Sequence, residues 1–334
     1  MPRQKKLKCL DLFSGIGGNA LALRSICKTI GYCEIDPFAV SVLEANMRRK
    51  NLDKAPIFPD VTKLKAVDIP TLPDGITASF PCQDISSAGT GKGIKGERSG
   101  LYVHIVRLVQ EFKKHLNHDI SFVLMENSPM IQYRGLPQII ETFERVGFSC
   151  NWVIKDVLSV GGRHLRRRWF MVAKNKRSSS TLPHITSFKF DFDKLDKVPR
   201  LTAVVDTASK YSARKRYCTL GNAVVPSVVV AAWNALNHPE FEKEVAYPNL
   251  PLLKFVNGTK CHTWQTPINS ESTWYPNKSY SGRQFRLFAT FVFHEFDTQK
   301  VFKYDRIEDA RKRWMLNPQW IETLMGFPVD WTLS

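Results

Sequence analysis

The order of apolar segments in the first half of the chain constrains its fold most strongly. From residue 7 to about residue 173, apolar runs of strand length alternate with segments of helical periodicity. This alternation is typical of an open, largely parallel sheet with helices packed on its faces. The strand-like runs cover residues 8–13, 32–35, 76–80, 122–126 and 169–173, and one helical face is formed by Leu101, Ile105, Leu108, Val109 and Phe112. We therefore expect an α/β fold with a mostly parallel sheet.

The later part of the chain differs in character. Residues 178–181 follow a basic turn and predict a loop, and residues 224–236 predict an apolar helix. After Asn237, prolines mark a linker, and aromatic side chains then interleave with Lys and Arg without the earlier rhythm. A chain of 334 residues exceeds the usual size of one domain. We therefore expect a large domain at residues 1–237 and a smaller one at residues 238–334.

The charge balance indicates the kind of partner. The chain carries 48 Lys and Arg against 31 Asp and Glu, a net charge of +17. This favours a polyanionic partner, although a merely soluble basic protein is the alternative. The seven cysteines include no Cys-x-x-Cys pair and no His at zinc-ligand spacing, so we expect reduced thiols and no metal. No apolar run approaches the length of a membrane span, so we expect no membrane association and no secretion.

A glycine-rich turn follows the first predicted strand and opens a helix. It reads Asp11-Leu-Phe-Ser-Gly-Ile-Gly-Gly18, and its glycines let the backbone approach a ligand closely. Glu34 lies near the end of the second predicted strand, where a carboxylate can accept hydrogen bonds from both hydroxyls of a ribose. The turn differs from the Gly-x-Gly-x-x-Gly of dinucleotide enzymes. Together the two features indicate a cofactor that contains adenosine.

Cys82 is a candidate nucleophile. It lies in the segment Ser79-Phe-Pro-Cys-Gln83, between an apolar strand and a glycine-rich stretch. A thiol at the end of a parallel strand is held rigidly on one side and reaches a ligand cleft on the other. A buried, inert cysteine is the structural alternative.

Several segments together resemble the DNA (cytosine-5) methyltransferase family. The glycine-rich turn and the Phe-Pro-Cys-Gln segment are the first two. Residues 125–129 (Met-Glu-Asn-Ser-Pro) match the family's Glu-Asn element, with Ser where Val is more usual. Residues 164–168 (His-Leu-Arg-Arg-Arg) stand where the family has Gln-x-Arg-x-Arg. Residues 220–226 (Leu-Gly-Asn-Ala-Val-Val-Pro) resemble the family's Gly-Asn-Ala-Val-Pro element with one extra Val.

The order of these motifs is permuted. Residues 316–328 resemble the segment that scaffolds the family's target-recognition region, and this segment usually precedes the Gly-Asn-Ala-Val-Pro element. Here it follows that element by about ninety residues. This order implies a target-recognition domain at the C-terminal end. Because no long regulatory extension is evident, the resemblance is to compact prokaryotic, phage or viral members.

The resemblance implies a Rossmann-like methyltransferase fold and S-adenosylmethionine as the cofactor. The implied reaction is methyl transfer to carbon 5 of cytosine in a short specific sequence of duplex DNA, through a covalent Cys82 adduct and a flipped base. Glu126 would hold ring nitrogen 3, and two arginines would favour the thiolate. The implied catalytic residues are Cys82, Glu126, Arg166 and Arg168. The base that removes the carbon 5 proton is not identified.

Two further groups of residues follow from the same resemblance. The expected cofactor-binding residues are Phe13, Ser14, Gly15, Ile16, Gly17, Gly18, Glu34, Ile35, Asp60, Val61, Pro81, Leu101, Asn222 and Ala223. The expected DNA-binding residues are Gln83, Ser86, Arg98, Arg283 and Arg286. Residues 84–100 contain five glycines among basic residues and predict either a mobile lid that closes on DNA or a disordered surface loop.

Structural alternatives remain for several of these residues. Glu126 could cap a surface strand, residues 166–168 could be a solvated charge run, and Asp60 could serve only a turn. Phe13 could simply belong to the core. Aromatic residues after Cys261 could likewise form the core of a small domain.

Alternatives also remain for the function. A non-catalytic DNA-binding relative would not need the cysteine, the glutamate and the cofactor turn together. Methylation of tRNA is the alternative within enzymes, because both substrates are polyanions. We expect a monomer in the cytoplasm, or in the host nucleus for a viral member, and the sequence leaves pairing with a restriction endonuclease open.

Overall fold

The structure is a computed structural model that describes residues 5–81, 99–162, 164, 166–186, 197–198, 201–203, 207–241, 253–254, 260–261 and 314–334. Its central strands are β1 (Leu7–Leu12), β2 (Cys27–Cys33), β3 (Ile57–Phe58), β4 (Gly75–Ala78), β5 (Phe122–Asn127), β6 (Phe148–Asp156) and β7 (Arg167–Asn175). Four short strands, β8 (Leu201–Ala203), β9 (Leu253–Lys254), β10 (Lys260–Cys261) and β11 (Trp314–Leu316), form two separate antiparallel pairs. The α-helices are α1 (Gly18–Leu23), α2 (Pro37–Arg48), α3 (Tyr102–Leu116), α4 (Ile131–Arg134), α5 (Leu136–Arg145), α6 (Thr207–Asn222), α7 (Pro226–Asn237) and α10 (Pro318–Leu324).

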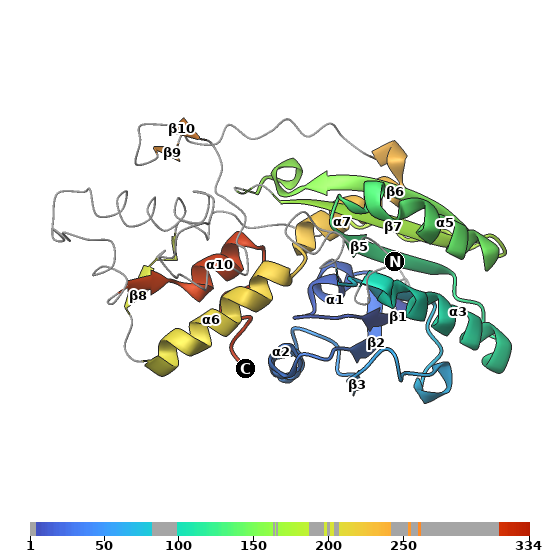
Figure 1. The fold of residues 1–334 in the computed structure, drawn as a ribbon, viewed down its shortest axis with the longest axis horizontal. Helices are drawn as coiled ribbons and strands as arrows, with labels where there is room; N and C mark the ends of the chain where they lie inside the picture. The colour runs from blue at the N-terminus through green and yellow to red at the C-terminus, as the bar shows by residue number, and fades with distance from the viewer. Residues whose placement is uncertain are drawn as a thin grey trace.

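The central sheet has the order β3-β2-β1-β4-β5-β7-β6 (Figure 1). The pairs from β3 to β5 are all parallel, and β7 runs antiparallel to both β5 and β6. This confirms the expected α/β fold with a mostly parallel sheet. All five predicted strands lie in it. Residues 178–181 form no regular element, as expected.

The register brings the carboxyl ends of three strands together. Leu12 of β1 is opposite Ala78 of β4, and Ala78 is opposite Met125 of β5. The residues after these strands therefore gather at one edge of the sheet. Because parallel strands share their direction, ligands of such folds bind outside that edge.

Helices cover both faces of the sheet. Leu10 and Leu12 pack in one core cluster with the buried face of α3, which includes the predicted Ile105, Leu108 and Phe112. Cys9 belongs to the cluster on the other face, with residues of α1 and α7. Alternate residues of β1 therefore enter opposite layers, as strand geometry requires.

The C-terminal residues share the second of these core clusters. Trp320, Leu324 and Trp331 pack in it with Leu21 of α1 and Val224. Figure 1 shows α10 beside α6, and the two helices are in contact. Residues 317–334 thus pack against the large domain, while the domain boundary at residue 237 stays a prediction.

One apolar stretch corrects an expectation from sequence. Residues 212–237 are long and apolar enough, by length and composition, to cross a membrane. The stretch is divided between α6 and α7, and its most apolar 18 residues are 61% buried inside the fold. Burial of this kind is typical of core helices.

Among the described residues, no cluster of three or more His, Cys, Asp or Glu could hold a metal ion.

Candidate functional site

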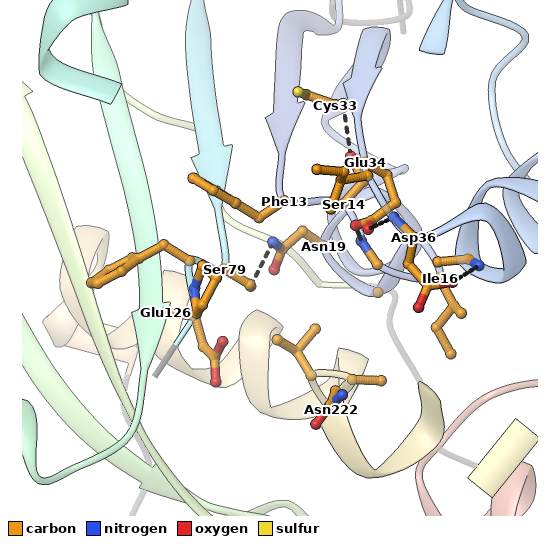
Figure 2. Close-up of a pocket in the computed structure, with 18 of the residues that line it drawn as sticks. Phe13, Ser14, Ile16, Asn19, Cys33, Glu34, Asp36, Ser79, Glu126 and Asn222 are labelled. Atoms are coloured by element: carbon orange, nitrogen blue, oxygen red, sulfur yellow. Dashed lines mark hydrogen bonds between the residues drawn. The ribbon is translucent and has the colours of Figure 1, made fainter. Parts of the chain in front are cut away.

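A cavity of about 640 Å³ lies at the carboxyl edge of the sheet. Figure 2 shows side chains from β-strand ends and from the α6–α7 region around it. Its walls come from the segments after β1, β2, β3 and β4, from the end of β5, and from the turn between α6 and α7. The cavity therefore occupies the position that the strand order predicts for a ligand.

The glycine-rich turn forms one end of this cavity. Gly15 and Gly17 have φ values of 53° and 84°, in the left-handed region that favours glycine. A Cβ on Gly18 would lie 2.5 Å from a methyl group of Val224, so only glycine lets α1 approach the α6–α7 turn this closely. The turn therefore needs glycine at these positions for shape and for packing.

Glu34 is attached to this turn. Its Oε2 accepts a hydrogen bond from the Gly15 amide at 2.7 Å, and its Oε1 accepts one from the Asp36 amide at 2.8 Å. Burial raises the pKa of Glu34, and the two amides act in the opposite direction. Each carboxylate oxygen retains a further lone pair, so Glu34 can still accept hydrogen bonds from a ligand.

The structure brings nearly all of the expected cofactor-binding residues to the cavity wall. The residues that line it are Phe13, Ser14, Gly15, Ile16, Gly18, Glu34, Ile35, Asp60, Val61, Pro81, Leu101, Asn222 and Ala223. Gly17 does not line it, and precedes α1 at its N-cap position. A Cβ there would lie 2.7 Å from Leu52, which points to a packing role for Gly17.

Glu126 and Arg168 form the opposite end. Glu126 lies near the end of β5, and the antiparallel pairing with β7 places Arg168 beside it. Arg168 Nε lies 3.0 Å from Glu126 Oε1, and the Glu126 side chain is only 9% exposed. Burial raises the pKa of Glu126, although Arg168 and Arg166 act to lower it. Glu126 is thus a buried carboxyl group in the cavity rather than a surface cap.

Arg166 has a different position from Arg168. It is buried and does not line the cavity, whereas Arg168 does. Arg166 Nη2 donates to the carbonyl oxygens of Gly221 at 2.9 Å and Ala223 at 2.6 Å. Residues 166–168 are therefore not simply a solvated charge run, and Arg166 holds the segment that carries Asn222 and Ala223.

The C-terminal segment also contacts the glycine-rich turn. Trp331 Nε1 donates to the carbonyl oxygen of Ile16 at 2.8 Å, and Asn46 Nδ2 donates to the carbonyl oxygen of Trp331 at 2.8 Å. The Trp331–Ile16 hydrogen bond joins residues 315 positions apart and could not be predicted from the sequence. It makes Trp331 part of the support of the cavity.

Some predicted site residues lie outside the described part of the chain. These are Cys82, Gln83, Ser86, Arg98, Arg283 and Arg286, together with most of the predicted lid. Sequence reasoning in turn missed Asn19 and Ser79, which line the cavity. Ser79 could have been found because it opens the Ser-Phe-Pro-Cys-Gln segment, but nothing around Asn19 signals its contact.

The fold and the cavity define a class of protein. A parallel sheet, a glycine turn after β1 and an acidic residue after β2 are the features of Rossmann-like domains that bind nucleoside-containing cofactors. The buried Glu126–Arg168 pair shares the same cavity, which adds groups able to act on a second ligand.

Comparisons with known proteins identify the family. The model of the C-5 cytosine-specific DNA methylase family matches residues 7–334, and the chain belongs to this family. The type II methyltransferase M.CviJI of Paramecium bursaria Chlorella virus IL3A is 30% identical over 238 residues, which are 70% of this chain and 60% of that protein. The type II methyltransferase M.MspI of Moraxella sp is 33% identical over 172 residues, 50% of this chain and 38% of that protein. The chain thus spans 60% or less of the length of these relatives. The resemblance stated from the motifs is confirmed.

Solved structures of similar proteins cover about half of the chain. The Dnmt2 methyltransferase of S. pombe is 21% identical, with a TM-score of 0.41 and coverage of 53% of this chain and 52% of that one. A putative DNA modification methyltransferase encoded within an E. coli prophage is 27% identical, with a TM-score of 0.41 and coverage of 51% and 47%.

Proposed function

We propose that this protein transfers a methyl group from S-adenosylmethionine to carbon 5 of cytosine in a short specific sequence of duplex DNA. The observation that carries the proposal is one cavity with two different ends. The glycine turn and Glu34 lie at one end, and the Glu126–Arg168 pair lies at the other. Membership of the methylase family and the net charge of +17 support the same reading.

The residues present fit the cofactor. Glu34 offers carboxylate lone pairs at the wall of the cavity, where they suit ribose hydroxyls. Nothing lies within 4 Å of a Cβ built on Gly15, so the turn leaves open space beside its backbone. Phe13 and Ile35 offer apolar surface at the same end. When bound, S-adenosylmethionine supplies an electrophilic methyl group, and these side chains hold its nucleoside.

The chemistry requires activation of the cytosine, because carbon 5 is too weak a nucleophile on its own. In the proposed first step, the Cys82 thiolate forms a bond to carbon 6, and electron density moves to carbon 5. Carbon 5 would then bond to the methyl group, and the electrons of the broken carbon–sulfur bond would stay with the departing thioether. A base would remove the carbon 5 proton, and the electrons of that C–H bond would restore the ring double bond as Cys82 leaves. The sequence and the described structure assign no residue as that base.

Glu126 would assist the attack from the other side of the ring. A protonated carboxyl group can donate to ring nitrogen 3 and so stabilise charge that develops when carbon 6 is attacked. Burial favours the protonated form of Glu126, which is the form this role needs. Arg168 then has two effects, because it fixes the carboxyl group and adds positive potential.

Carbon 6 is stacked inside a duplex, so the cytosine must be flipped out of the helix. The residues proposed to contact DNA are Gln83, Ser86, Arg98, Arg283 and Arg286, and the proposed recognition domain is residues 238–334. We further propose a monomer that acts in the cytoplasm, or in the host nucleus for a viral member.

Mass spectrometry of nucleic acids tests the function directly. Duplex DNA of mixed sequence and tRNA are incubated separately with the protein and S-adenosylmethionine that carries a labelled methyl group. We expect labelled 5-methylcytosine in the DNA and none in the tRNA. Label in tRNA alone would replace DNA by RNA as the substrate, and no label in either would favour a non-catalytic binding protein.

Replacement of Glu126 by Gln should slow methyl transfer by about a hundredfold, within the range for loss of a general acid. The amide cannot donate a proton to the ring in the same way, but it has nearly the same shape. Single-turnover rates on duplex DNA measure the effect, and DNA binding should change little. Glu141→Gln, on the exposed face of α5, is the matched control. A wild-type rate in Glu126→Gln would assign the role to another group.

Replacement of Trp331 by Phe should weaken S-adenosylmethionine binding by about fivefold, the equivalent of one lost hydrogen bond. Phe keeps the aromatic packing but cannot donate to the Ile16 carbonyl, so the cofactor turn loses a restraint. Isothermal titration of the cofactor measures the change. Trp152→Phe, on an exposed position of β6, should bind as the wild type does. Unchanged affinity in Trp331→Phe would mean that the turn is held by its own contacts.

A further inference from the structure

Ser79 has no part in the chemistry proposed above, yet it lies between the two ends of the cavity. Asn19, at the start of α1, is buried and donates from Nδ2 to Ser79 Oγ at 3.1 Å (Figure 2). The Ser79 amide donates to the Leu12 carbonyl oxygen at 3.4 Å. A hydroxyl oxygen that accepts a hydrogen bond still has its own proton to donate. The Asn19 contact therefore leaves the Ser79 proton for another acceptor.

Glu126 is the candidate acceptor, because Ala78 lies opposite Met125 on neighbouring strands, so that Ser79 and Glu126 follow side by side, and both line the cavity. Burial raises the pKa of its carboxyl group, while Arg168, Arg166 and a side-chain hydrogen bond from Ser79 all act to lower it. A hydrogen bond to a carboxylate favours the charged form, so the direction of the Ser79 effect is that of a donor. Asn19, Ser79 and Glu126 thus follow one another along the cavity, from the glycine-rich turn to the proposed catalytic carboxyl group (Figure 2).

We propose that Ser79, oriented by Asn19, is a positioning residue that fixes the Glu126 carboxyl group and keeps its proton exchangeable. Burial alone favours the protonated form of Glu126. Ser79 and Arg168 act in the opposite direction and so favour release of the proton. This role of Ser79 deepens the proposed function, and it rests on that function for the action of Glu126 on cytosine.

Other ionisable groups lie near Glu126, so the test must report on the Glu126 carboxyl group alone. Arg168 and Arg166 approach it from the β7 side. Burial, followed by Arg166 and Arg168, lowers the pKa of the nearby His164 to about 3, so that ring is neutral near pH 7. Behind Asn19, burial raises the pKa of Asp11 to about 7. Because Asp11 titrates near neutral pH, a change in activity alone would not identify Glu126.

Carboxyl ¹³C NMR titration of protein labelled at glutamate reports on Glu126 without any methyl transfer. Aspartate is unlabelled, and the spectrum of Glu126→Gln assigns the Glu126 signal. In Ser79→Ala a contact that lowers the pKa is lost, so the titration midpoint should move to higher pH. Ser79→Thr restores the hydroxyl and should return the midpoint towards the wild-type value. Ser128→Ala is the matched control, because Ser128 also lines the cavity, and it should leave the midpoint unchanged.

A second measurement connects the effect to the reaction. The single-turnover rate of methyl transfer in Ser79→Ala should fall about fivefold near neutral pH, as expected for one lost hydrogen bond. The alkaline limit of the pH–rate profile should move to higher pH, because Glu126 stays protonated over a wider range. A Glu126 midpoint that is the same in Ser79→Ala and wild type overturns the proposal. Failure of the wild type to methylate DNA would overturn the proposed function, and the NMR result would still decide the role of Ser79.

Discussion

Replacement of Cys82 by Ser should abolish methyl transfer while cofactor binding stays nearly intact. Serine has almost the same shape as cysteine, but its hydroxyl is far less acidic and does not supply the nucleophile that adds to carbon 6. Of the expected cofactor-binding residues that line the cavity, only Pro81 belongs to the Cys82 segment. Affinity for S-adenosylmethionine, measured by isothermal titration, should therefore survive the change.

Trapping on duplex DNA that contains 5-fluorocytosine makes this test decisive. Fluorine at carbon 5 cannot be removed as a proton, so a covalent enzyme–DNA adduct accumulates in the wild type. Cys218 is a thiol that lines the cavity, so Cys218→Ser is a matched control and should still form the adduct. Cys33 lines the cavity as well, and burial raises the pKa of its thiol to about 12, which makes it a poor nucleophile. An adduct that persists in Cys82→Ser would contradict the assignment.

The parts of the fold that were predicted correctly are those with a local sequence signal. Apolar runs mark β1, β4 and β5 because these strands are buried on both faces. β3 has only two residues, and β6 is exposed at several positions, so neither strand was predicted. The antiparallel direction of β7 also escaped prediction, because periodicity carries no information about direction.

In the candidate site, too, features with a local sequence signal were predicted and features that depend on long-range packing were not. Strand-end motifs place Ser14, Glu34 and Glu126 at one edge of a parallel sheet, so their convergence on one cavity follows from topology. Contacts between distant segments do not follow in this way. The Asn19–Ser79 and Trp331–Ile16 hydrogen bonds join residues 60 and 315 positions apart. Both depend on how helices and the C-terminal segment pack, and no short motif encodes that packing.

A buried polar network, which the sequence did not reveal, holds the C-terminal segment in place. Glu322 of α10 is completely buried, and its Oε1 lies 2.7 Å from Nη2 of Arg216 on α6. The same carboxylate accepts hydrogen bonds from the amides of Asp330 at 2.7 Å and Thr332 at 2.8 Å, and from the Thr332 hydroxyl. Arg216 Nε in turn donates to Thr332 Oγ1 at 2.6 Å. This network attaches the segment that contains Trp331 to α6.

Replacement of Glu322 by Leu should therefore lower the free energy of unfolding by about 3–5 kcal/mol, the usual cost of breaking a buried ion pair by removal of one partner. The loss arises because Arg216 keeps its charge in a buried position and the amides of Asp330 and Thr332 lose their acceptor. Urea denaturation measures the change.

A double change and a surface pair serve as controls. Glu322→Leu combined with Arg216→Met removes both charges and should recover part of the loss, because two apolar side chains can replace a buried pair. Glu141→Ala breaks an exposed pair on α5 and should cost less than about 1 kcal/mol. If the C-terminal segment supports the cofactor turn, Glu322→Leu should also weaken S-adenosylmethionine binding below the unfolding transition. A loss for Glu322→Leu no larger than that for Glu141→Ala would show that apolar packing of Trp320 and Trp331 alone holds the segment in place.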